Sequence, residues 1–115
     1  MRLTTHKTNA GLVICVDEPR IDAAVAIEFK EAVRSATQGA AGPVILDLSQ
    51  VTFLDSSGLG AVVAVMKLLA PDRALELAGL TPSVARVFRL TRMDSVFTIH
   101  ERAPGSPGPS LKAAG

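Results

Sequence analysis

The chain has 115 residues, of which 48% are hydrophobic and 20% are charged, and its formal net charge is +1. This size predicts one globular domain with an ordinary core and leaves no room for a second domain. The 12 basic and 11 acidic residues are scattered along the sequence. The chain therefore has no basic cluster of the kind that binds nucleic acid or an anionic membrane.

The chain also lacks the sequence marks of export and of disulfide bonding. Its apolar runs are too short to span a membrane and its N-terminus has no signal-like apolar stretch, so we expect a cytoplasmic protein without membrane insertion. The only cysteine, Cys15, lies in the apolar run Leu12 to Val16. We expect it to act as a small buried hydrophobe rather than as a reactive thiol, and it excludes an intrachain disulfide.

The predicted elements begin with an antiparallel hairpin. Leu3–Lys7 and Leu12–Val16 are strand-like and flank Thr8–Gly11, whose Asn and Gly suit a tight turn. Asp22 is the expected N-cap of a first helix, which Gly39–Pro43 terminates. Helical spacing places one apolar stripe of this helix toward the core: Val25, Phe29, Ala32, Val33 and Ala36.

A buried strand, Val44–Leu48, then leads through the polar elbow Asp55-Ser56-Ser57-Gly58 into a second helix that starts near Ser56 and ends before Pro71. At about 100° per residue, this helix has one core stripe and one opposite stripe. The core stripe comprises Leu59, Val62, Val65, Met66 and Leu69. The opposite stripe comprises Ser57, Gly60, Ala64, Lys67 and Leu68. The opposite stripe is either an ordinary solvent face or, because its residues near the elbow are small, a surface that a partner's backbone can approach closely. On the first helix, Ile27 projects among charged residues and is a minor candidate for the same role.

The remaining elements complete an α/β fold. Ala74–Ala78 predicts a strand, Thr81-Pro82 starts a third helix, and Val96–Ile99 predicts the last strand. The third helix should turn Val84, Val87, Phe88 and Leu90 inward and Arg86 and Arg89 outward. This order predicts a small α/β sandwich with a mixed, mostly parallel sheet of about five strands, an N-terminal antiparallel hairpin and helices packed against the sheet. We expect residues 1–102 to form this domain and the Pro/Gly-rich residues 103–115 to be a disordered tail.

The elbow lacks the companions that known catalytic motifs require. Gly58-Leu59-Gly60 is not followed by Lys-Ser/Thr, so the elbow is not a P-loop. A hydrolase nucleophile elbow requires Gly-x-Ser-x-Gly, but Leu54 and Asp55 precede Ser56. The only histidines, His6 and His100, lie at opposite ends of the sequence, and one cysteine with two distant histidines has no metal-ligand spacing. We therefore predict neither a metal nor a cofactor, and no enzymatic activity.

A hydroxyl at a helix N-terminus without a base to activate it suits a substrate better than a catalyst. Phosphorylation of Ser56 would add about 1.5 to 2 negative charges, which the free N–H groups and the helix dipole tolerate, although Asp55 would repel them. The alternative is that Ser56 only caps the helix while Asp55 and Ser57 satisfy its first turn.

The segment Ile45–Leu69 resembles the signature of the STAS domain, specifically of bacterial anti-sigma factor antagonists. Arg20-Ile21-Asp22-Ala23 resembles the family's acidic first turn, and Thr81–Phe88 resembles the helix after its fourth strand, so the resemblance covers roughly residues 3–100. Two features depart from the family. Its first turn often reads Gly-Glu-Leu-Asp where this chain has Val16-Asp17-Glu18-Pro19-Arg20-Ile21-Asp22. The Pro/Gly-rich tail also cannot form the helix that commonly follows the last strand in the family.

The resemblance implies a partner switch. An unphosphorylated domain of this family binds an anti-sigma factor that is also a serine kinase of the GHKL ATPase type, and the kinase phosphorylates the serine that corresponds to Ser56, with Ser57 as the alternative acceptor. A PP2C-type serine phosphatase reverses the reaction. The expected partner-binding residues are Asp22, Asp55, Ser56, Ser57, Gly58, Gly60, Ala64 and Lys67.

Two other functions remain open at this point. The domain could be a STAS subunit of a lipid-transport or other membrane-associated complex, in which the second helix docks a partner constitutively. It could also be a small hydrolase or nucleotide-binding enzyme, a possibility that no residue of the sequence supports.

Overall fold

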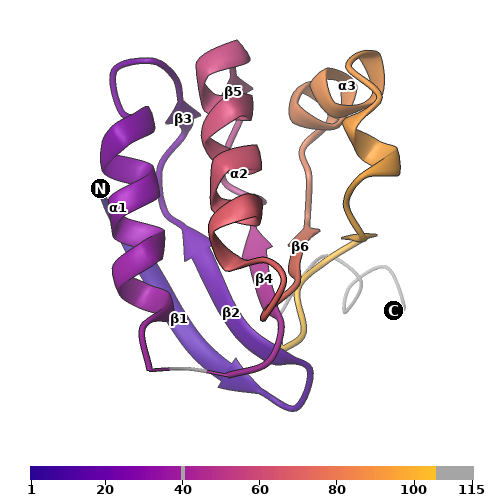
Figure 1. The fold of residues 1–115 in the computed structure, drawn as a ribbon. Helices are drawn as coiled ribbons and strands as arrows, with labels where there is room; N and C mark the ends of the chain where they lie inside the picture. Colours follow the sequence, from indigo (N-terminus) through magenta and orange to yellow (C-terminus); the bar gives the residue numbers. More distant parts are fainter. Residues whose placement is uncertain (40, 106–115) are drawn as a thin grey trace.

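The computed structural model describes residues 1–39 and 41–105. In chain order the elements are β1 (Leu3–Thr8), β2 (Gly11–Val16), β3 (Arg20–Ile21), α1 (Ala26–Thr37), β4 (Val44–Asp47), β5 (Phe53–Leu54), α2 (Ser56–Leu69), β6 (Leu75–Ala78), α3 (Pro82–Leu90), the 3-10 helix η1 (Met93–Ser95) and β7 (Ile99–His100). Figure 1 shows α1 and α2 side by side and running in the same direction in front of the sheet. Within the described residues no helix is long and apolar enough to cross a membrane.

The main sheet has five strands in the order β1-β2-β4-β6-β7. The β1–β2 hairpin is antiparallel, with Leu3 opposite Val16, and every other neighbouring pair is parallel. A mixed, mostly parallel sheet with an N-terminal antiparallel hairpin is the predicted fold class, which is therefore confirmed. Two very short strands, β3 and β5, pair in parallel outside this sheet.

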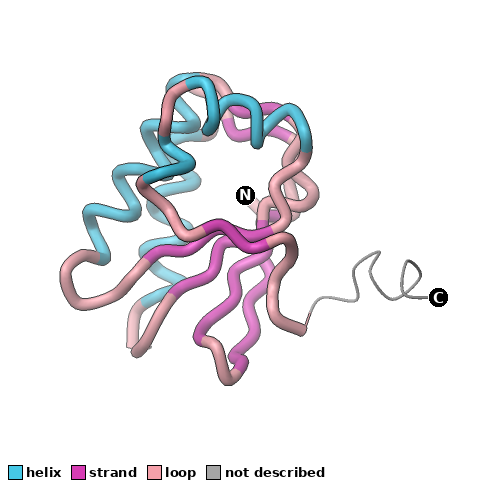
Figure 2. The backbone as a smooth tube through the Cα atoms, turned by 90° about the vertical axis from the view of Figure 1, so that its right-hand side faces the viewer, coloured by secondary structure: helices cyan, strands magenta, loops and turns pink. Residues whose placement is uncertain are grey.

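The main core lies between the sheet and the helices. Alternate strand residues such as Ile14 and Leu46 point toward the helices and are fully buried, as are Phe29 of α1 and Val62 of α2. A fully buried side chain of this kind contributes about 1.5 to 3 kcal/mol relative to an exposed one. Figure 2 shows the helices gathered on one side of the sheet.

The described residues place no helix on the other face of the sheet, called here the helix-free face, but this face has a small core of its own. Val13, Ile45 and Ala78 are at most 1% exposed, and the segment after β7 covers them with Ala103, which is itself 4% exposed. The packed part of the chain thus reaches Ala103, the first residue of the predicted tail. Residues 106–115 of that tail lie outside the described residues.

Several predicted element boundaries and orientations were wrong. Helix α1 begins at Ala26 and not after Asp22, because Asp22 organises a turn: its carboxylate accepts a hydrogen bond from Ala24 N (3.1 Å) and its carbonyl accepts one from Val25 N (3.1 Å). Leu90 is 70% exposed rather than inward, because α3 ends at that residue.

The last strand is also displaced from its predicted position. It is Ile99–His100 rather than Val96–Ile99, because η1 occupies Met93–Ser95 and leaves Val96 47% exposed. Within the predicted core stripe of α2, Val62, Val65 and Leu69 are buried, whereas Leu59 and Met66 are only half-buried against the core.

Candidate functional site

The elbow between β5 and α2 is built around the carboxylate of Asp55. Asp55 is the N-cap of α2, and its Oδ1 accepts a hydrogen bond from Gly58 N at 2.8 Å. Its carbonyl accepts the first helical bond from Leu59 N at 2.8 Å. A side-chain cap of this kind stabilises a helix by about 1 kcal/mol and fixes the backbone direction at its start.

The same carboxylate ties the elbow to the loop before α1. Oδ2 of Asp55 accepts a hydrogen bond from Ala23 N at 3.3 Å. The two loops meet because β3 and β5 pair in register, with Ile21 opposite Leu54, so that Asp22 and Asp55 both follow directly after paired residues. The loops that carry Asp22 and Asp55 thus lie side by side, and both carboxylates accept hydrogen bonds from backbone N–H groups.

Gly58 sits where the first turn of α2 presses on β3. A Cβ atom at this position would lie 2.0 Å from the carbonyl oxygen of Ile21 and 3.0 Å from Cδ1 of Leu54. Gly58 is buried, so it brings the backbones together and presents no surface of its own. Only glycine allows this approach without movement of one of the two segments.

Ser56 and Ser57 form the exposed tip of the elbow. Both are exposed, and neither hydroxyl makes a hydrogen bond to any residue that the structure describes. The N–H groups of a helix's first turn have no intrahelical acceptor, and the positive end of the helix dipole lies there. The tip therefore offers two free hydroxyls in a place that favours an added negative charge.

The stripe that leads away from the tip along α2 is accessible. Gly60 and Lys67 are exposed, Leu68 is 53% exposed, and Ala64 is half-buried. A cavity of about 270 Å³ lies beside it, between α1 and α2, lined by Lys30, Glu31, Arg34, Ala64, Val65 and Leu68. On α1, Ile27 is 71% exposed, as its position among charged residues predicted.

One feature of the site was missed from the sequence. The guanidinium carbon of Arg20 lies 4.1 Å from the ring centroid of Phe53, and Arg20 Nε contacts Asp22 Oδ2 at 3.2 Å. Both residues belong to the β3–β5 pair, whose strands are only two residues long. No periodic pattern marks strands of that length, but the Phe-Leu pair directly before the elbow could have indicated one.

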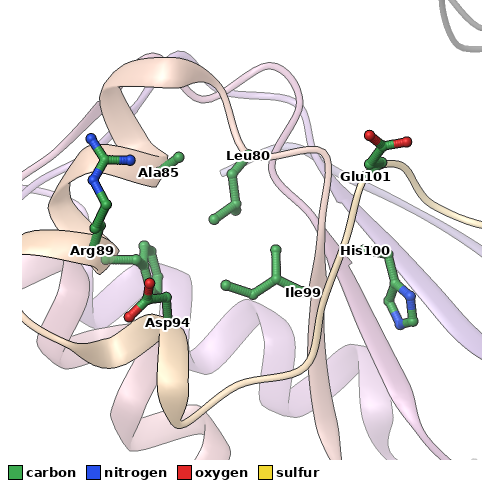
Figure 3. A pocket seen from close by; sticks show the side chains of 8 residues that line it. Leu80, Ala85, Arg89, Asp94, Ile99, His100 and Glu101 are labelled. Atoms are coloured by element: carbon green, nitrogen blue, oxygen red, sulfur yellow. The ribbon is translucent and has the colours of Figure 1, made fainter.

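A cavity beside α3 is lined by none of the predicted site residues. It measures about 350 Å³ and is lined by Leu80, Ala85, Phe88, Arg89, Asp94, Ile99, His100 and Glu101. Figure 3 shows Leu80 and Ile99 pointing into it, with Arg89 and Asp94 along one rim and the His100 ring turned away. His100 Nε2 instead contacts Glu76 Oε1 at 2.7 Å. Within the described part of the chain, no three His, Cys, Asp or Glu residues group as metal ligands.

Cys15 lies on the helix-free face of the sheet, away from the elbow. Its Sγ is 3.6 Å from Oδ2 of Asp47, which faces it across the β2–β4 pair. Burial, followed by the neighbouring Asp47 carboxylate, raises the pKa of the Cys15 thiol to about 11. A thiol that stays protonated is a poor nucleophile. Cys15 was predicted to be buried, but its side chain is only half-buried.

Comparison with known proteins places the chain in a family. The family profile of the STAS domain matches residues 2–103. An anti-sigma-B factor antagonist of Listeria monocytogenes is 36% identical over 81 residues, which are 69% of this chain and 70% of that protein. An anti-sigma-B factor antagonist of Staphylococcus aureus is 27% identical over 75 residues, 64% of this chain and 69% of that protein.

Solved structures share the fold. The STAS domain protein from Planctomyces limnophilus, described as an anti-sigma-factor antagonist, aligns with a TM-score of 0.76 at 21% identity, covering 97% of this chain and 96% of its own. The Bacillus protein SpoIIAA in its phosphorylated form aligns with a TM-score of 0.59 at 19% identity, covering 99% of this chain and 100% of its own. The family profile and the Listeria relative together show that this chain belongs to the STAS domain family, among the bacterial anti-sigma factor antagonists.

Proposed function

We propose that this protein is a phosphorylation switch whose modified residue is Ser56. In the unphosphorylated form it binds an anti-sigma factor that is also a serine kinase of the GHKL ATPase type, and the sigma factor is set free. The kinase then phosphorylates Ser56, the complex separates, and a PP2C-type phosphatase restores the binding form. The observation that carries this proposal is the pair of exposed hydroxyls at the N-terminus of α2, neither of which makes a hydrogen bond to a described residue.

The elbow can accept a phosphate without unfolding. A phosphate adds about 1.5 to 2 negative charges, and the free N–H groups and dipole of α2 favour an anion at this end. The Asp55 carboxylate opposes it, but both of its oxygens already accept backbone hydrogen bonds, from Gly58 N and Ala23 N. The new charge therefore acts mainly on a surface pressed against the tip, which it repels.

The predicted partner-binding residues divide into two roles. Ser56, Ser57, Gly60 and Lys67 are exposed and would contact the partner directly. Asp22, Asp55 and the buried Gly58 would shape the backbone beneath that contact. Ala64 is half-buried and borders the cavity between α1 and α2.

The names of the relatives support a phosphorylation switch in general terms. The Listeria and Staphylococcus proteins are named as antagonists of an anti-sigma factor. SpoIIAA has been solved in both a phosphorylated and an unphosphorylated form, so a domain of this fold persists in both states. By analogy, a phosphate at Ser56 would change which partner is bound and leave the fold intact.

Phosphotransfer followed by a binding measurement tests the proposal. Purified protein is incubated with ATP and each GHKL-type anti-sigma factor kinase of the source genome, and the product is mapped by mass spectrometry. One phosphate at Ser56 is expected, with none on Ser56→Ala and normal transfer to Ser57→Ala. Phosphate on Ser57 alone would move the switch to the alternative acceptor.

Titration calorimetry then compares the wild type with Ser56→Asp, which should lose kinase binding. If the phosphorylated protein and Ser56→Asp both bind as tightly as the wild type, the switch is refuted. Constitutive docking, as in a membrane-associated STAS subunit, would then be the better description.

A further inference from the structure

We infer that Arg20 and Phe53 form a recognition site for an acidic side chain of the partner, and that this site decides which partner can occupy the elbow. The inference rests on the proposed function, because its partner is the protein that docks over Ser56 and Ser57. It adds a residue pair that determines specificity, next to the residues that carry the switch.

The pair is held in place by the short β3–β5 ladder. Arg20 lies directly opposite Phe53, and the next pair, Ile21 and Leu54, is buried at 0% and 5% exposure. Because side chains alternate along a strand, Arg20 and Phe53 face outward together. The guanidinium carbon stacks over the ring at 4.1 Å, a separation typical of a cation–π contact.

The guanidinium group is oriented but not saturated. Its Nε contacts Asp22 Oδ2 at 3.2 Å, and neither terminal nitrogen has an acceptor among the residues that the structure describes. The Arg20 side chain is 57% exposed and Phe53 is 39% exposed. Because the contact with Asp22 is made by Nε, the two terminal nitrogens remain available to a further carboxylate.

This geometry fits the carboxylate of an aspartate or glutamate. The planar fork of an arginine binds a carboxylate through two parallel hydrogen bonds. The ring and Asp22 already fix its orientation, so little side-chain freedom is lost on binding. Exposed arginine and aromatic residues are also the types that most often dominate the energy of protein interfaces.

The pair adjoins the phosphorylatable tip. Phe53 is followed by Leu54 and then by the N-cap Asp55, while Arg20 is followed by Ile21 and Asp22, whose neighbour Ala23 donates to Asp55. Figure 1 shows β3 and β5 at the same end of the molecule as the start of α2. A partner that covers the tip therefore borders the pair, and an acidic residue at its edge would meet the guanidinium.

Charge reversal at Arg20 tests the inference. The affinity of Arg20→Glu, Arg20→Lys and Phe53→Ala for the purified GHKL-type kinase that phosphorylates the wild type is measured by titration calorimetry at two salt concentrations. Arg86→Glu is the matched control, because Arg86 is exposed on the outward face of α3. We expect Arg20→Glu to bind at least about tenfold more weakly, Arg20→Lys and Phe53→Ala to fall between, and the control to be unchanged. Circular dichroism and thermal melting check that each variant is folded, and Arg20→Lys carries the test if the reversal unfolds the protein.

A compensating charge change in the kinase identifies the acidic residue that contacts Arg20. Each exposed Asp or Glu of the kinase is changed to Arg, and one such variant should recover binding to Arg20→Glu while it binds the wild type less well. Unchanged affinity of folded Arg20→Glu, with Ser56→Asp still inactive, overturns this inference and leaves the proposed switch standing. Absence of wild-type binding to any kinase overturns both. If Arg20→Glu binds normally but its phosphorylated form melts at a lower temperature than phosphorylated wild type, Arg20 serves the phosphate instead, and the inference is wrong.

Discussion

Replacing Gly58 with alanine should destabilise the domain, although alanine is the better helix former. The new Cβ would lie 2.0 Å from Ile21 O and 2.9 Å from Ile21 C, both backbone atoms that cannot rotate away. Overpacking of this kind costs up to about 3 kcal/mol, and disturbing the Asp55 cap on Gly58 N costs about 1 kcal/mol more. The higher helix propensity of alanine returns about 1 kcal/mol, which leaves a net loss of up to roughly 3 kcal/mol.

The same helix offers a matched control at Gly60. A Cβ there has nothing within 4 Å, so Gly60→Ala should gain about 0.5 to 1 kcal/mol from helix propensity alone. Urea unfolding followed by circular dichroism measures both variants. With the urea dependence usual for a small domain, a loss of about 3 kcal/mol would lower the midpoint of Gly58→Ala by roughly 1 to 3 M. If Gly58→Ala is as stable as Gly60→Ala, the close contact between α2 and β3 is not what determines glycine at this position.

Two further predictions concern side chains with assigned partners. Asp55→Ala should destabilise the domain by about 1 to 2 kcal/mol, because Gly58 N and Ala23 N lose their acceptor. Asp55→Asn, which keeps one carbonyl oxygen, should cost less, and equal stability of the two variants in urea would contradict the capping role. For Cys15, whose pKa is raised from 9.0 to about 11, iodoacetamide should modify the folded protein with a midpoint near the higher value and the unfolded protein near the lower. The folded state binds this proton more tightly, so the thiol's contribution to stability should decline as the pH rises between these values. Asp47→Asn should lower the Cys15 midpoint of the folded protein but not bring it down to 9.0, because burial is the larger cause of the raised pKa. A midpoint near 9.0 in the folded wild type would show that the thiol is not buried as described.

The parts of the fold predicted correctly are those with long periodic patterns. The hairpin, the three long helices and the strands Val44–Asp47 and Leu75–Ala78 each carry an apolar run or a repeated stripe. The elbow was also located correctly, because a polar cluster between an apolar strand and an apolar helix stands out in the sequence. Local composition was sufficient for these features.

The parts that were missed depend on contacts between distant residues. Asp22 was predicted to cap α1, but the ladder between β3 and β5 brings Ala23 N to Asp55, 32 positions away, and the helix starts only at Ala26. The stacking of Arg20 on Phe53 depends on the same ladder. The burial of Gly58 likewise requires Ile21 O as its neighbour. No short-range pattern encodes these contacts, because each one exists only after two loops have been brought together.

The helix-free face of the sheet has a consequence for how the domain can be shortened or joined to other proteins. Val13, Ile45 and Ala78 would be open to water but for the chain that returns across them and seats Ala103. Apolar surface left exposed on a sheet invites contact with other molecules. A fusion or truncation made directly after His100 would remove that cover, so a tag belongs beyond Gly105. The segment from Glu101 to Gly105 is thus needed to keep this apolar face covered, whereas the residues of the elbow are needed to bind a partner.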